Sequence, residues 1–218
     1  IADCTEWYET KGNGLVFRVL KGADSFLRMR VAQHRLDGLI VISRYLERFY
    51  RRCANVVLVP PLVDMDEPKW ESEPAPSRGN TIRFVYAGSP GKRKDNLGRF
   101  LAALHAARHA GDFEFLVAGI TAEEHLANHP AQGGLVAELG ERVRFLGRIP
   151  HADSIALLRS ANYSVLVRDS TRTTRAGFPT KFVESVACGV RVLATNSSDL
   201  REYLADPRLG VLVEDGEG

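Results

Sequence analysis

The segment Gly177-Phe-Pro-Thr-Lys-Phe-Val-Glu-Ser-Val-Ala-Cys-Gly-Val-Arg-Val-Leu-Ala-Thr195 predicts a glycine-bearing loop, a short helix and a buried strand in succession. Pro179 suits the first helical turn, where its missing N–H costs nothing. Gly189 suits the end of the helix, and the apolar run that follows is typical of a buried strand. The sequence therefore predicts a loop that leads directly into the N-terminus of a helix.

This predicted helix start is a natural seat for a phosphate group, because its first backbone N–H groups lack partners within the helix. Glu184 lies one turn into the helix and can accept hydrogen bonds from neutral hydroxyls such as those of a ribose. Helical spacing puts Lys181 and Glu184 on one side, together with Ser185 and Cys188. The opposite, buried side is expected to carry Phe182, Val183, Val186 and Ala187.

Strand-like and helix-like runs alternate through the last two thirds of the chain. The expected strands are residues 82–87, 113–118, 143–146, 163–167, 190–194 and 210–213. The expected helices are residues 96–109, a broken region 121–139, 152–160, 179–188 and 199–205. This alternation predicts an α/β fold, a Rossmann-like doubly wound parallel sheet with helices on both faces. Ligands of such folds bind at the carboxyl ends of the strands, where Ser89, Lys94, Arg148, residues 168–180 and residues 196–198 are expected.

The first third of the chain has a different organisation. A helix is expected at residues 24–35, a strand at 38–42, a helix capped by the Ser43 hydroxyl, and a strand at 56–59. The segment 66–80 is rich in Pro, Glu and Ser and is interpreted as a linker. We predict an N-terminal α/β segment at residues 1–65, the linker at 66–80, and a larger α/β domain at 81–218.

Composition excludes several classes of function. A net charge of +2 over 218 residues gives no reason to expect nucleic acid as a partner. No Walker sequence is present, and no strand leads into Gly-x-Gly-x-x-Gly, which argues against a nicotinamide or flavin enzyme. Three cysteines without metal-type spacing indicate reduced thiols and a cytoplasmic location. The pairs His105/His109 and His125/His129 lack a third ligand and are interpreted as surface histidines.

Several motifs in this order resemble the retaining nucleotide-sugar glycosyltransferases of the GT-B fold (glycosyltransferase family four, group 1 type). The donor motif of that family is matched by Gly177, Pro179, Lys181, Glu184 and residues 187–189. The other matching stretches are Tyr86-Ala-Gly-Ser-Pro-Gly-Lys-Arg-Lys-Asp-Asn-Leu97, Val143-Arg-Phe-Leu-Gly-Arg-Ile149, Asp37-Gly-Leu-Ile-Val-Ile-Ser-Arg-Tyr-Leu46 and Val59-Pro-Pro-Leu-Val-Asp64. The resemblance covers most of the chain. It implies that residues 81–218 form the nucleotide-sugar-binding donor domain, truncated at its end, and that residues 1–65 are a remnant of the acceptor-side domain.

The resemblance also implies roles for individual residues. The donor diphosphate is expected to contact Gly88, Ser89, Lys94, Gly177, Phe178, Pro179, Thr180 and Lys181. Glu184 is expected to hold the ribose, and Gly147, Arg148 and Ile149 to border the nucleobase. Lys181 is expected either to neutralise the departing diphosphate or to pair with Glu184 three residues on. No catalytic residue is assigned, because the general base is expected in the acceptor domain, outside this chain.

Two positions depart from the family pattern. Ser89 stands where the family has an arginine, and Lys92 or Arg93 is expected to substitute for that positive charge. Ala176 stands where the family often carries a first glutamate near the transferred sugar. Backbone N–H groups of Gly177 and Phe178 are expected to hold the sugar or the phosphate instead.

The activity that the resemblance implies is transfer of a sugar, with retention, from a nucleotide sugar to an acceptor hydroxyl. No metal and no other cofactor is expected. The acceptor is a glycan, a lipid-linked compound or a small molecule in bacterial cell-surface glycan synthesis, and the Arg-rich first third allows peripheral association with the inner face of the membrane. Residues 1–218 alone are expected to be inactive. The alternatives are a GT-B epimerase or phosphorylase and a non-catalytic nucleotide-sugar-binding domain.

Overall fold

The computed structural model describes residues 1–8, 14–70, 79–90 and 94–213. The chain divides into two units. Unit 1 comprises Ile1–Leu62, Ser170–Pro179 and Ser197–Asp199, and unit 2 comprises Val63–Asp169, Thr180–Asn196 and Leu200–Gly218. The predicted boundaries at 65, 66–80 and 81 stay a prediction, because most of the expected linker lies outside the described residues.

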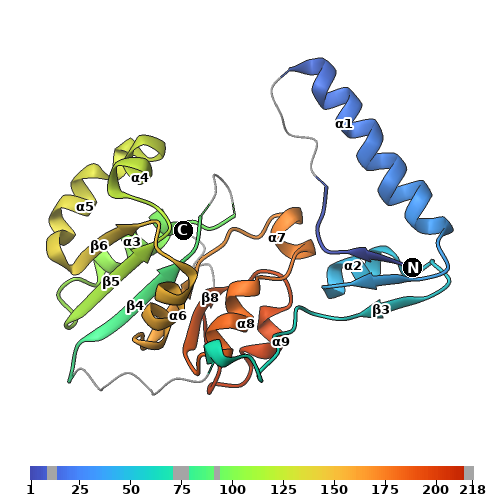
Figure 1. Ribbon diagram of the computed structural model, residues 1–218. Helices are drawn as coiled ribbons and strands as arrows, with labels where there is room; N and C mark the ends of the chain where they lie inside the picture. The colour runs from blue at the N-terminus through green and yellow to red at the C-terminus, as the bar shows by residue number, and fades with distance from the viewer. Residues whose placement is uncertain (9–13, 71–78, 91–93, 214–218) are drawn as a thin grey trace. The chain divides into compact units, whose positions relative to one another are not determined.

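Unit 2 is built on a parallel sheet of six strands, as the alternating pattern predicts (Figure 1). The strands are β4 Ile82–Ala87, β5 Phe113–Ala118, β6 Val143–Gly147, β7 Tyr163–Leu166, β8 Arg191–Thr195 and β9 Gly210–Val213. Their spatial order is β6-β5-β4-β7-β8-β9, and every neighbouring pair is parallel. This order confirms the Rossmann-like doubly wound fold class.

The strand order reverses between β4 and β7, which pair with each other through Phe84–Tyr163 and Val85–Ser164. The connection after β4 leads outward to β5 on one side, and the connection after β7 leads to β8 on the other side. Chain segments therefore diverge above the carboxyl ends of these two strands. Open α/β sheets bind ligands at this point, which we call the crevice.

Helices cover both faces of this sheet. On one face, α3 and α5 pack over Tyr86, Phe115 and Val165. On the other face, Leu158 of α6 packs against Val85 and Leu116, and α8 contacts β7 and β8. The helices of unit 2 are α3 Leu97–Ala106, α4 Ala122–Asn128, α5 Gly133–Leu139, α6 His151–Arg159, α8 Thr180–Ala187 and α9 Leu200–Tyr203.

Helix α8 ends as the sequence predicts but buries a different side. Gly189 has φ 71°, its N–H donates to the Val186 carbonyl, and Val190 N–H donates to the Ser185 carbonyl, which together form a Schellman motif. Phe182 is buried as expected, whereas the expectation of an outward Ser185 is wrong. Ser185 is fully buried, and its hydroxyl has polar partners there: it lies 2.8 Å from the Ser164 hydroxyl and 2.7 Å from the Lys181 carbonyl oxygen.

Unit 1 contains a parallel sheet of three strands in the order β1-β2-β3: Ala2–Cys4, Leu39–Val41 and Val56–Leu58. Helix α2, Arg44–Phe49, begins at Ser43, whose hydroxyl accepts a hydrogen bond from Leu46 N–H, so the predicted cap is confirmed. The helix expected at residues 24–35 has a different start. Helix α1 spans Leu15–Leu27 and continues as a π-helical turn, Arg28–Ala32, and a 3₁₀ turn, Gln33–Arg35.

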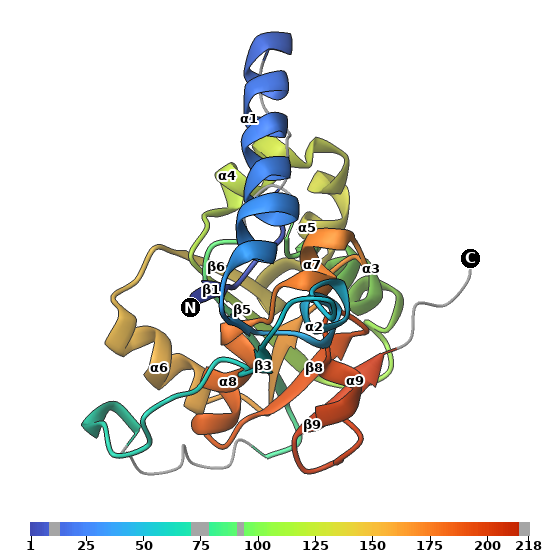
Figure 2. The ribbon, with the colours of Figure 1, turned by 90° about the vertical axis from the view of Figure 1, so that its right-hand side faces the viewer.

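Helix α1 extends beyond the strands of its unit, as both views show (Figure 2). Its first half carries the exposed side chains Leu15, Val16, Val19 and Leu20. The early start was missed, although these apolar residues recur at the spacing of one helix face, with Arg18 and Lys21 on the other. None of the helices in the described part of the chain is long and apolar enough to cross a membrane.

Glycines bring the ends of β4 and β5 together beside the crevice. Gly119 has φ 106°, and a Cβ atom at this position would lie 2.3 Å from the Gly88 carbonyl oxygen. We expect Gly119→Ala to destabilise unit 2 by roughly 2–4 kcal/mol, because the left-handed backbone and a backbone clash act together. Chemical denaturation followed by circular dichroism measures the loss.

The matched control is Gly133→Ala. Gly133 opens α5 with φ −57°, and no atom outside its own helix lies within 4 Å of an added Cβ. Its replacement should be neutral or stabilising by up to about 1 kcal/mol. Equal stability of the two variants would contradict the close approach of the two strand ends.

Candidate functional site

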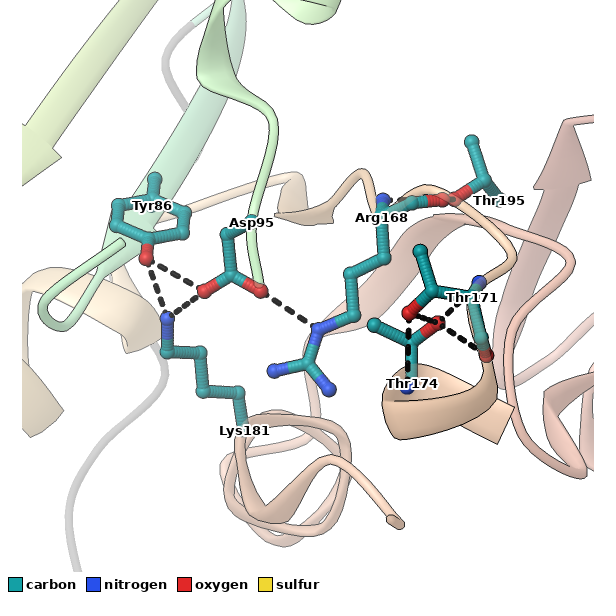
Figure 3. A network of polar contacts seen from close by, with 7 residues as sticks. All are labelled: Tyr86, Asp95, Arg168, Thr171, Thr174, Lys181 and Thr195. Atoms are coloured by element: carbon teal, nitrogen blue, oxygen red, sulfur yellow. Dashed lines mark hydrogen bonds and ion pairs between the residues drawn. The ribbon is translucent and has the colours of Figure 1, made fainter. Parts of the chain in front are cut away.

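A cluster of polar side chains occupies the crevice between β4 and β7 of unit 2 (Figure 3). Tyr86 comes from the end of β4, Asp95 from the loop that follows it, Arg168 from the end of β7, and Lys181 from the first turn of α8. We call these four residues the Asp95 cluster. The loop after β4 therefore meets the end of β7 and the start of α8, which lie more than 70 residues further along the chain, at the point where the strand order reverses.

Lys181 is held by two oxygen atoms. Its Nζ lies 2.5 Å from Asp95 Oδ2 and 2.5 Å from the Tyr86 hydroxyl oxygen, and it sits 4.0 Å from the centroid of the Tyr86 ring. Gly88 makes room for this side chain, because a Cβ at Gly88 would lie 2.5 Å from Lys181 Cε. Of the two roles left open for Lys181, pairing with Glu184 is not what the structure shows: its hydrogen-bond partners are Asp95 and Tyr86.

Arg168 provides the second cation. Its Nε donates to Asp95 Oδ1 at 2.6 Å. The backbone of Arg168 is fixed by Thr195 at the end of β8, whose hydroxyl oxygen accepts from Arg168 N–H at 2.8 Å and lies 2.6 Å from the Arg168 carbonyl oxygen. The guanidinium is therefore anchored by both its backbone and its carboxylate partner.

The Asp95 carboxylate is 3% exposed, Arg168 is 11% exposed and Lys181 is 19% exposed. Burial opposes the ionisation of Asp95, but Lys181 and Arg168 outweigh it and hold the pKa of Asp95 below its usual value. Burial also lowers the pKa of Lys181, against the opposing effect of Asp95. Burial and Asp95 raise the pKa of Tyr86, which therefore stays protonated and donates to Asp95 at 2.6 Å.

Two cations and one carboxylate leave the crevice with an excess of positive charge. The carboxylate orients both cations, and the Lys181 ammonium has a third N–H beyond those that donate to Asp95 and Tyr86. An anion with several oxygen atoms, such as a diphosphate, fits this arrangement.

The residues predicted to bind the diphosphate are divided between the two units. Gly88 lies directly against Lys181, whereas Ser89 and Lys94 are exposed in the loop after β4 and Thr180 is exposed at the start of α8. Lys92 and Arg93, the expected substitutes for the missing arginine, lie outside the described residues. Gly177, Phe178 and Pro179 belong to unit 1.

The structure of the predicted phosphate-binding loop, residues 177–179, differs from the prediction in one respect. Gly177 N–H is not without a partner: it donates to the Thr173 carbonyl at 3.0 Å. This bond closes the short helix α7, Arg172–Ala176, which the sequence did not predict. Helix α8 begins at Thr180, directly after Pro179.

Ala176 is a packing residue of unit 1. It is fully buried in the cluster that contains Leu46 and Tyr50, and its carbonyl oxygen accepts a hydrogen bond from the Ser43 hydroxyl at 2.6 Å. A glutamate side chain does not fit in this apolar position without an uncompensated charge. The departure from the family pattern at this position therefore has a structural reason within unit 1.

Glu184 lies beside the loop predicted to border the nucleobase. Its Oε1 is 3.9 Å from Nε2 of His151, the first residue of α6. Gly147, Arg148 and Ile149 precede this helix, and Gly147 is fixed by hydrogen bonds with Gly119 and Ile120. The predicted ribose residue and the predicted base loop therefore share one edge of unit 2.

Sequence reasoning missed the roles of Tyr86, Asp95 and His151. Tyr86 and Asp95 lie in the motif at residues 86–97, in which the basic residues were predicted to contact the diphosphate. Arg168 was placed at the carboxyl edge of the sheet but without a role. The available signal for the Asp95 cluster was a tyrosine at the end of a predicted buried strand with an acidic residue in the loop after it.

The interpretation of His125 as a surface histidine is wrong. His125 is 2% exposed, and its Nε2 lies 2.8 Å from Gln132 Oε1, a contact that satisfies the ring nitrogen inside unit 2. Burial lowers the pKa of His125. Within the described ranges, no group of three or more His, Cys, Asp or Glu side chains is placed to hold a metal ion.

Comparisons with known proteins agree with this architecture. The chain is 27% identical over 194 residues to the phosphatidyl-myo-inositol mannosyltransferase of Mycobacterium leprae, which covers 87% of this chain and 49% of that protein. The chain thus spans about half the length of this curated relative.

Solved structures share the fold. Sucrose-phosphate synthase from Thermosynechococcus elongatus superposes with a TM-score of 0.67 at 18% identity, over 99% of this chain and 54% of that one. An α,α-trehalose-phosphate synthase from Burkholderia xenovorans gives 0.64 at 13% identity, over 89% and 54%. The family model described as glycosyl transferases group 1 matches residues 81–218, which is more than half of the chain. This protein therefore belongs to the glycosyl transferases of group 1, and its α/β architecture is that of their GT-B fold.

Proposed function

We propose that this chain forms the donor-binding part of a retaining glycosyltransferase that moves a sugar from a nucleotide sugar to an acceptor hydroxyl. The observation that carries the proposal is the Asp95 cluster, which concentrates two buried cations at the crevice where the strand order reverses. The family membership supports sugar transfer as the reaction class.

In the proposed mechanism the nucleoside diphosphate departs while the acceptor hydroxyl attacks from the same face. Lys181 and Arg168 stabilise the charge that develops on the departing diphosphate, because they are already oriented by Asp95 before the reaction begins. Glu184 accepts hydrogen bonds from the ribose, and His151 with residues 147–149 borders the nucleobase. The general base comes from outside this chain, so residues 1–218 alone are proposed to transfer no sugar.

The proposed acceptor is a glycan or a lipid-linked hydroxyl compound in cell-surface glycan synthesis. The lipid-linked alternative is supported by the name of the mycobacterial relative, a phosphatidyl-myo-inositol mannosyltransferase. The proposed compartment is the cytoplasm, with the inner membrane face as the site of the acceptor. Cys4, Cys53 and Cys188 are free thiols in the described chain, which supports a reducing compartment.

The first test of the proposal is metal-free binding. Because cationic side chains line the crevice, we expect a nucleoside diphosphate to bind residues 1–218 with the same affinity in EDTA and in Mg²⁺. Titration calorimetry measures both. Binding that appears only with Mg²⁺ or Mn²⁺ would show that the cations of the Asp95 cluster do not hold the diphosphate.

The second test concerns Glu184. Two charge-assisted hydrogen bonds to ribose hydroxyls contribute enough that Glu184→Ala should weaken nucleoside diphosphate binding by roughly 10-fold or more. The melting temperature without ligand should stay unchanged, because Glu184 is partly exposed and fills no core volume. Glu141→Ala, an exposed glutamate elsewhere in unit 2, is the matched control and should bind as the original chain does. An unchanged affinity in Glu184→Ala removes Glu184 from the proposed site.

The third test concerns Asp95. Asp95→Asn leaves the largely buried Lys181 and Arg168 without their carboxylate, so we expect a loss of roughly 1–3 kcal/mol in the free energy of unfolding at pH 7. The folded pKa of Asp95 lies below its usual 3.8, so the carboxylate stabilises the fold above that pH and loses this effect as the pH falls through the folded pKa.

The difference between the original chain and Asp95→Asn should therefore be constant from pH 5 to pH 8 and should shrink below pH 3.8, as denaturation at each pH will measure. Asp153→Asn, an exposed aspartate on α6, should change little at either pH. A difference that is the same at pH 3 and pH 7 would mean that the carboxylate charge does not hold the cluster together.

A further inference from the structure

Unit 1 contains a cavity of about 590 Å³ that none of the roles described above uses. All of its lining residues belong to unit 1. They include three arginines and three large apolar side chains, namely Arg30, Arg172, Arg175, Trp7, Phe26 and Met29. This volume is in the range that encloses small organic ligands.

The three arginines lie against aromatic rings instead of carboxylates. Arg172 is 4.9 Å from the Trp7 ring centroid, Arg175 is 5.3 Å from that of Tyr45, and Arg30 is 5.4 Å from that of Phe49. Within residues 1–8, 14–70, 79–90 and 94–213, none of the three side chains forms an ion pair. A ring that covers the flat face of a guanidinium leaves its N–H edge available to an anion.

Helix α7 fixes two of these arginines. The Thr171 hydroxyl accepts from Thr174 N–H, and the Thr174 hydroxyl accepts from Thr171 N–H, which forms a capping box at the start of the helix. At the other end, the buried Ala176 and its bond from Ser43 attach the helix to the core of unit 1. Arg172 and Arg175 are three residues apart and therefore lie on one side of this anchored helix.

The charge of the lining is one-sided. The described lining contains no carboxylate, while the hydroxyl groups of Tyr8, Ser25 and Thr171 add neutral hydrogen-bonding groups. Three guanidinium groups match a phosphate ester better than a carboxylate, because a phosphate monoester carries close to two negative charges at neutral pH and offers three acceptor oxygens. Trp7 and Phe26 supply flat apolar surface for the carbon skeleton of the same ligand.

We propose that this cavity binds a phosphorylated sugar or polyol, with the phosphate held by Arg30, Arg172 and Arg175 and the carbon skeleton against Trp7. Phosphate recognition in unit 1 stands independently of donor binding. The role of the ligand rests on the proposed function: if unit 2 binds a nucleotide sugar, the phosphorylated compound in unit 1 is the acceptor.

The test measures binding to residues 1–218 by titration calorimetry with a hexose 6-phosphate and with the unphosphorylated hexose. We expect binding of the phosphate ester at least about 10-fold tighter than of the hexose, and a loss of affinity as the salt concentration rises. Sedimentation with vesicles that contain phosphatidylinositol, compared with vesicles of phosphatidylcholine alone, distinguishes a lipid-borne phosphate from a soluble one. Binding in either arm supports the site only if the variants below reduce it.

The decisive variants are Arg172→Gln and Arg172→Gln/Arg175→Gln. Each should lower the affinity for the phosphate ester by roughly 10-fold or more. The melting temperature should stay unchanged, because both side chains are exposed. Arg172→Lys, which keeps the charge but loses the planar fork, should fall between them and the original chain. Arg51→Gln, an exposed arginine of unit 1 outside the cavity lining, is the matched control and should bind normally.

The outcomes separate this proposal from the donor site. Nucleoside diphosphate binding that persists in Arg172→Gln/Arg175→Gln while the phosphate ester is lost supports two distinct sites. Equal affinity for the hexose and its phosphate, or an effect of Arg51→Gln as large as that of Arg172→Gln, overturns the cavity as a phosphate site. Failure of nucleoside diphosphates to bind, with the phosphate ester still bound through Arg172, overturns the proposed function and leaves this site standing.

Discussion

The carboxylate of Asp95 is shielded from water, and this one buried charge determines how the crevice of unit 2 is built. An ionised carboxylate inside a protein costs several kcal/mol unless cations and hydrogen bonds compensate it. Lys181, Arg168 and Tyr86 provide that compensation from three different segments of the chain. The loop after β4, the end of β7 and the start of α8 are consequently held at a single point. The two cations that an anionic ligand would meet are already oriented when it arrives.

A short continuous stretch of chain supplies cations to both units. Arg168 and Lys181 belong to the Asp95 cluster, whereas Arg172 and Arg175 lie between them in the sequence and line the cavity of unit 1. The two pairs are stabilised by different chemistry. The cations of unit 2 are neutralised in part by a carboxylate, and those of unit 1 are covered by aromatic rings. An anion bound in unit 2 would therefore share its two cations with the Asp95 carboxylate. An anion bound in the cavity of unit 1 would meet arginines that have no carboxylate partner in the described lining.

The parallel sheet of unit 2 could be predicted from the sequence because buried parallel strands are apolar throughout, and runs such as 113–118 stand out between amphipathic helices. The Ser43 cap and the Gly189 stop follow from local backbone chemistry and were equally accessible. Asp95 was not, because an acidic residue next to Lys94 in a loop looks solvated until its partners at positions 168 and 181 are known. Helix α7 has five residues and too little periodicity to be recognised. The burial of His125 depends on Gln132, a contact that no pattern of spacing indicates.

The order of the two units along the chain has a practical consequence for anyone who divides this protein. A piece that begins at residue 81 corresponds to the family match, yet it includes α7, which belongs to unit 1. In such a piece Ala176 loses Leu46 and Tyr50 as neighbours, and its carbonyl loses the Ser43 hydroxyl. Residues 170–179 would then have no core to pack against. Both ends of this segment are attached to the segments that carry Arg168 and Lys181. The residues matched by the family model are therefore not the same as the residues that form a unit with its own hydrophobic core.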